Sequence, residues 1–145
     1  ALAPLGLSEP KTGDDVVAFD DKSEAAIAEH ARGAAPDPRW EPQIFRHHPP
    51  SDASGWAHVA VSRPDLGSGL TLQVSYRTAE LPLLWQWRML RSGDYVMGIE
   101  PATGSVAGRA ASRAEGLLRA LDPGDAVSVE LAEGGFGARV EKVIP

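Results

Sequence analysis

The chain has 145 residues, a formal net charge of -6 and no cysteine. Without cysteine there is neither a disulfide framework nor a thiolate metal site, which fits a reducing compartment. The acidic balance and the absence of a basic cluster exclude a groove for nucleic acid. No apolar run approaches the ~18 residues of a membrane-spanning helix, so the composition predicts a soluble, cytoplasmic globular protein without a membrane partner.

Residues 1–40 are rich in Ala, Pro, Asp and Gly and predict a long loop region. Within it, only residues 23–32 favour a short helix, because the run is rich in Ala and Ser23 is a good N-cap residue. Pro36 and Pro38 end any such helix and force extended backbone before them. A loop of this length is either functional or mobile in a compact domain.

From Gln43 onward the pattern changes to short strands separated by turns. The clearest case is residues 70–77, where apolar and polar side chains alternate with the period of two of a half-buried strand. Short strands at this spacing indicate an antiparallel β-sandwich, an all-β fold. Residues 105–120 fit either a helix or irregular structure. The expected strands are 43–47, 56–61, 70–76, 83–90, 94–100, 126–131 and 137–143.

The most informative stretch is residues 83–103, which predict two strands joined by a tight Ser-Gly-Asp turn. The second strand ends at Glu100, directly before Pro101, and the first contains Trp85, Gln86 and Trp87. A carboxylate beside Trp and Gln side chains suits an acid/base site for a sugar. An exposed Glu at the end of an ordinary hairpin is the structural alternative.

Several motifs in this order resemble the C-terminal part of the aldose 1-epimerase (galactose mutarotase)-like family, and in particular a bacterial branch classed as a domain of unknown function. They are Gln86 to Leu90, Gly93 to Ala102, Gly108-Arg109, Glu115-Gly116 and Leu121 to Gly124. The similarity is dense over residues 83–125 and thinner over residues 39–82.

The resemblance implies that residues 1–145 form the C-terminal segment of one mutarotase-like sandwich, with the upstream half on the same chain or on a separate one. The implied activity is interconversion of sugar anomers by general acid/base chemistry, without a metal or organic cofactor. In this family the base is a Glu that follows a Gly and an apolar residue, and Gly98-Ile99-Glu100 matches that context. The family's proton-donating His comes from the first half of the fold, so we expect it outside this chain.

Further candidates for substrate binding follow from side-chain chemistry and from the resemblance. Gln86 and Arg88 share one side of their strand, where an amide would bind hydroxyls and a guanidinium would bind a carboxylate or phosphate. Trp87, on the other side, would stack on a pyranose unless it is core. Glu41 lies near the place where the family has a sugar-binding Asp, but both its identity and its register differ. Arg109 would bind an anionic substituent, or serve only in capping or surface pairing.

His47 and His48 do not predict a metal site, because adjacent residues of a strand point to opposite faces and no third ligand is close in sequence. Two other functions stay open. One is a non-catalytic carbohydrate-binding sandwich, and the other is a sugar isomerase or lyase that uses the same acid/base frame. The sequence does not identify the sugar.

Overall fold

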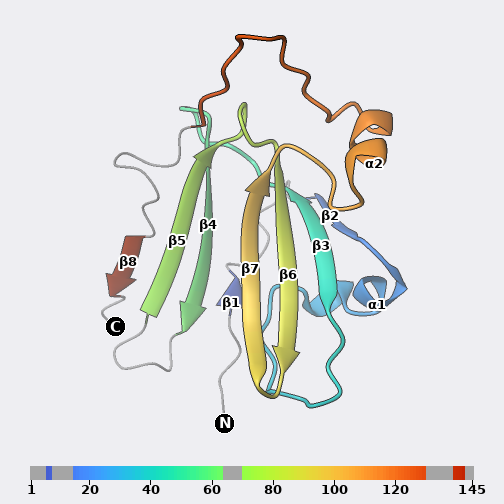
Figure 1. Ribbon diagram of the computed structural model, residues 1–145. Helices are drawn as coiled ribbons and strands as arrows, with labels where there is room; N and C mark the ends of the chain where they lie inside the picture. Colours follow the sequence, from blue (N-terminus) through green and yellow to red (C-terminus); the bar gives the residue numbers. More distant parts are fainter. Residues whose placement is uncertain (1–5, 8–14, 64–69, 130–138, 143–145) are drawn as a thin grey trace.

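The computed structural model describes residues 6–7, 15–63, 70–129 and 139–142. They form two four-stranded antiparallel sheets, with strand orders β1-β4-β5-β8 and β2-β3-β6-β7 (Figure 1). The expected all-β fold of antiparallel sheets in a sandwich-like arrangement is therefore confirmed. The strands are β1 (Gly6–Leu7), β2 (Asp15–Ala18), β3 (Gln43–His48), β4 (Trp56–Arg63), β5 (Leu70–Arg77), β6 (Leu83–Arg91), β7 (Asp94–Ala102) and β8 (Arg139–Lys142).

The helical segments are short: α1 (Asp21–Glu24), a 3₁₀ turn η1 (Ile27–Glu29) and α2 (Arg109–Ala114). Neither described α-helix has the length or the apolar character needed to cross a lipid bilayer. Residues 105–120 were expected to be either helical or irregular, and six of them form helix α2.

The N-terminal region differs from the prediction. Strand β2 pairs with β3 inside the region expected to be a loop, and the helix expected over residues 23–32 is broken into α1 and η1. Asp20, not Ser23, caps α1, because its carboxylate accepts from the Ser23 N–H at 2.9 Å. Ser23 is fully buried, and its hydroxyl accepts from the Ile44 N–H at 2.8 Å. This tertiary hydrogen bond ties the short helix to β3.

The strand predicted over residues 126–131 is wrong for its described part, since residues 126–129 have no regular secondary structure. Residues 130 and 131 lie outside the described residues. The strand predicted over 137–143 is present as β8 at residues 139–142, paired with β5.

The apolar core lies between the two sheets. Tyr76 and Ala57, from β5 and β4, pack with Leu84 of β6 and with Leu81, and Ile99 of β7 packs against them. The face of the second sheet that carries Leu84 and Ile99 is therefore its inner face. Directly paired residues of an antiparallel ladder share a face, so the register places the remaining side chains. The inner face carries Phe45, His47, Gln86, Arg88 and Met97, and the outer face carries Ile44, Arg46, Trp85, Trp87, Gly98 and Glu100.

Candidate functional site

Glu100 lies on the outer face of the second sheet, directly opposite Trp85 of the neighbouring strand. Its side chain is exposed and folds back over Gly98. A Cβ added at Gly98 would meet the Glu100 Oε1 atom at 2.5 Å and the Trp87 Cβ atom at 3.4 Å. The missing side chain at position 98 therefore leaves the space in which the carboxylate lies, beside a half-buried indole.

Two further polar side chains lie on the same face, on strand β3. Arg46 is paired in register with Trp85, and its Nη1 atom forms an ion pair with the Glu115 carboxylate just after α2. The Arg46 Nε atom is buried and has no hydrogen-bond partner among the described residues. His48 lies two residues farther along β3 and is exposed. We name Glu100, Trp87, Arg46 and His48 the Glu100 face.

The structure separates Gln86 and Arg88 from Glu100. Both lie on the inner face, where they are 0% and 2% exposed, so they do not form the open binding surface expected from the sequence. The Gln86 amide donates to the His30 carbonyl at 2.8 Å. The Arg88 guanidinium donates to the carbonyls of Glu29 and Arg32 at 3.2 and 2.7 Å.

These hydrogen bonds fasten the segment 27–34, which covers part of the inner face. Tyr95 adds a hydrogen bond from its hydroxyl to the Ala34 carbonyl at 2.6 Å. Burial lowers the pKa of the Arg88 guanidinium, since desolvation disfavours its charged form. The contacts of Gln86 and Arg88 are thus with their own chain, and their visible role is to hold the covering segment in place.

The two adjacent histidines of β3 point to opposite faces, as predicted. His47 is buried on the inner face, with its Nε2 atom 3.1 Å from the Gln86 Oε1 atom, while His48 is exposed on the outer face. The His30 ring lies 5.3 Å from the His47 ring, measured between centroids. No group of three or more His, Cys, Asp or Glu residues that would hold a metal ion occurs within the described part of the chain.

The other two predicted binding residues are exposed, and Glu41 lies away from Glu100. Glu41 forms a surface ion pair with Lys22 at 3.2 Å. Arg46 lies in register with Glu100 across the sheet. Glu41 is five residues before Arg46, which corresponds to roughly 17 Å of extended chain. Arg109 is the first residue of α2 and is exposed. Of the predicted site residues, Trp87 lies beside Glu100, since both side chains border the space over Gly98.

Arg46 and His48 were not identified from the sequence as residues on the same face as Glu100. Both share one side of β3 by the alternation of a strand, which the sequence shows. Their position on the face of Glu100 depends on the pairing of β3 with β6, which joins residues about 40 positions apart in the chain.

The comparisons with known proteins give a family but no activity. No curated protein and no solved structure matches the chain. One family covers most of it, with a match over residues 10–133. The chain therefore belongs to the family described as a domain of unknown function (DUF4432).

Proposed function

We propose that the Glu100 face is the acid/base site of an aldose 1-epimerase-like protein and that Glu100 is its general base. The observation that carries the proposal is the position of Glu100: an accessible carboxylate two residues before the end of β7, above a glycine and beside a half-buried Trp. A carboxylate in this place meets the anomeric hydroxyl of a sugar whose apolar face stacks on the indole. The ordered motifs that resemble the mutarotase-like family support the same assignment.

The reaction needs two proton transfers. Glu100 takes the proton of the anomeric hydroxyl while an acid protonates the ring oxygen, and the ring opens to the aldehyde. Closure of the ring on the other face of the carbonyl returns both protons and gives the other anomer. Each positioned group contributes about 10²–10⁴ in rate.

The acid is the second requirement of the proposal. The resemblance to the mutarotase-like family implies a His in this role. Among the described residues, His48 is the histidine on the same face, two strands and two residues from Glu100. Standard strand spacings put the two Cα atoms about 12 Å apart. Leu83 and Trp85 of β6 lie between them on this face, and both side chains are buried. As the histidine of the Glu100 face, His48 is the residue of this chain to test as the acid.

The test uses polarimetry to measure anomer interconversion by the wild-type protein and by Glu100→Gln over a panel of neutral and acidic sugars. Gln keeps the size of Glu and still accepts a hydrogen bond, but it does not take up the proton. We expect turnover to fall about 10²–10⁴-fold, or about 3–5 kcal/mol of transition-state stabilisation. His48→Gln reports on the acid in the same assay.

Asp94→Asn is the matched control, because Asp94 is an exposed carboxylate on the same strand and the same face, at its far end. It should leave turnover unchanged. If Glu100→Gln matches the wild type on every sugar that the wild type converts, Glu100 is not the base. If the wild type binds sugars but converts none, the exposed Glu100 and half-buried Trp87 favour the alternative function, a non-catalytic carbohydrate-binding sandwich.

A further inference from the structure

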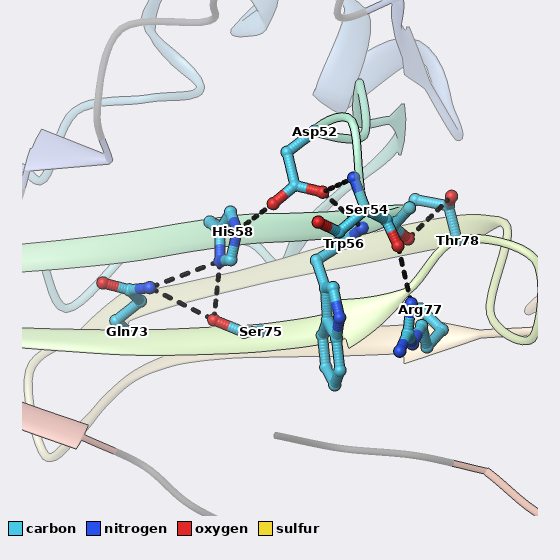
Figure 2. Close-up of polar contacts among 9 residues, drawn as sticks. Asp52, Ser54, Trp56, His58, Gln73, Ser75, Arg77 and Thr78 are labelled. Atoms are coloured by element: carbon cyan, nitrogen blue, oxygen red, sulfur yellow. Dashed lines mark hydrogen bonds and ion pairs between the residues drawn. The ribbon is translucent and has the colours of Figure 1, made fainter. Parts of the chain in front are cut away.

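A second polar cluster lies on the other sheet, on the face turned away from the core (Figure 2). His58 of β4 and Ser75 of β5 are directly opposite one another in the antiparallel ladder. The His58 Nδ1 atom is 2.8 Å from the Ser75 Oγ atom, and its Nε2 atom is 3.2 Å from the Asp52 Oδ2 atom. A hydroxyl, an imidazole and a carboxylate therefore form one continuous chain of hydrogen bonds.

The direction of the hydrogen bonds in this chain follows from the carboxylate. The Trp56 backbone N–H and the His58 ring hold the pKa of Asp52 below its usual range, so the carboxylate is ionised at neutral pH and only accepts. When the His58 ring is neutral, it therefore carries its hydrogen on Nε2, which leaves the Nδ1 lone pair facing Ser75. Ser75 consequently donates its hydroxyl proton to Nδ1, as a serine does before it attacks a carbonyl.

The three groups are held in place by the backbone around them. The Asp52 Oδ1 atom accepts from the backbone N–H groups of Ser54 and Trp56, at 2.8 and 3.0 Å. The turn is closed by the Gly55 N–H, which donates to the Asp52 carbonyl at 3.0 Å, and Gly55 has a positive φ of 84°. The ladder fixes the separation of His58 and Ser75. The site is thus set before any ligand arrives.

The cluster is also accessible. The side chains of His58 and Asp52 are 47% and 43% exposed, and Ser75 beside them is half-buried. Gln73 lies two residues before Ser75 on the same face of β5, and its Nε2 atom is 3.1 Å from the Ser75 Oγ atom. An amide in this position is able to donate to a negative oxygen that forms next to Oγ.

We propose that Ser75, His58 and Asp52 form a second site, independent of Glu100, that hydrolyses small acyl esters. Ser75 Oγ attacks the ester carbonyl and its proton passes to His58 Nδ1, giving a tetrahedral oxyanion to which Gln73 donates. The C–O bond to the alcohol breaks, and the alcohol leaves with the proton from His58. Water, deprotonated by His58, then attacks the acyl-Ser75 ester, releases the acid and restores the Ser75 hydroxyl.

The substrate class follows from the surroundings of Ser75. The strand face is open to solvent at His58 and Asp52, so within the described residues it offers no apolar pocket that would select a long acyl chain. This suits esters with a short acyl chain and a good leaving group. Asp52 is a positioning residue, because its contacts are with His58 and the turn, whereas Ser75 and His58 touch the reacting atoms.

The test uses p-nitrophenyl acetate with the 145-residue chain, reading p-nitrophenolate release and the intact mass. We expect an acetyl group on the peptide that contains Ser75, and release at least about tenfold faster than from Ser75→Ala. The expected difference of about tenfold is smaller than the roughly 10²–10⁴-fold rate enhancement of acid/base catalysis in an enclosed site, because water screens the charges of an exposed site. Ser92→Ala, an exposed turn serine on the other sheet, is the control and should react like the wild type.

Asp52→Asn tests the hydrogen-bond chain itself. Asn keeps the oxygen that accepts from the turn, but its amide donates to the His58 Nε2 atom and forces the hydrogen onto Nδ1. We expect the acylation rate to fall as far as in His58→Gln, with a switch of tautomer in the imidazole ¹⁵N spectrum that a loss of stability alone would not produce. Equal release from Ser75→Ala and wild type, or acetyl groups only on other residues of the wild type, would overturn the proposal.

Discussion

Gly98→Ala separates the geometry of the Glu100 face from the stability of the sheet. The added Cβ atom would lie 2.5 Å from the Glu100 Oε1 atom, about 1 Å closer than an ordinary contact. The carboxylate is the end of a flexible side chain, so it would move away at a cost of about 0.5–1.5 kcal/mol. Replacing Gly by Ala in a compatible backbone restores about 0.4–1 kcal/mol through the unfolded state. The two effects offset each other.

We therefore expect the free energy of unfolding of Gly98→Ala, measured by urea denaturation, to stay within about 1 kcal/mol of the wild-type value. A displacement of about 1 Å at a catalytic group costs up to about 10² in rate, so anomer interconversion should fall by a comparable factor. Gly104→Ala is the control for adding a Cβ atom at a glycine. There the new atom would meet the Ser112 hydroxyl at 3.1 Å instead of a catalytic group, so anomer interconversion should not fall. Full activity in Gly98→Ala would refute the assigned position of the Glu100 carboxylate.

Three further predictions concern two buried side chains, Ser23 and Arg88, and two carboxyl groups. Ser23→Ala should cost about 1–3 kcal/mol in urea denaturation, because the buried Ile44 N–H loses its acceptor. Arg88→Met should lower stability by about 1–3 kcal/mol through two orphaned carbonyls yet leave the affinity for any bound sugar unchanged, as titration calorimetry would show. The hydrogen bonds from Ser23 to Asp20 and from Trp56 to Asp52 lower the pKa values of both carboxyl groups. The ionised carboxylates therefore stabilise the fold above pH ~4, and this stability should be lost as the pH falls through their pKa values in the folded protein. Thermal melts at about pH 2–7 would show a falling melting temperature.

Six of the eight strands in the described residues are readable from the sequence, and the reasons are local. Alternation marks residues 70–77, and a two-residue turn at Ser92-Gly93 joins the hairpin, with Gly93 at a φ of 97°. Strand β2 escaped prediction because four residues in an Asp-rich stretch carry too little periodicity. Its pairing with β3 defines it.

The candidate site was predictable in part. A turn at Ser92-Gly93 pairs Arg91 with Asp94, and counting outward from that pair places Glu100 opposite Trp85 and away from Gln86. The register of the hairpin alone therefore puts Gln86 and Arg88 on the opposite face of the sheet from Glu100. Which of the two faces is buried is not local information, because the contacts that bury Gln86 and Arg88 come from a segment more than 50 residues earlier in the chain.

The central claim, that sugars bind on the Glu100 face and not on the inner face, is tested most directly by the four Trp indole N–H signals in a ¹H–¹⁵N spectrum. Two of them belong to the outer face of the second sheet, at Trp85 and Trp87. Trp40 donates to the Arg88 carbonyl at 3.4 Å, and Trp56 packs beneath Arg77 on the other sheet. Titration with the sugar that the protein converts should shift the Trp87 signal most and leave Trp40 and Trp56 in place. A shift of Trp40 with Trp87 unmoved would contradict the account.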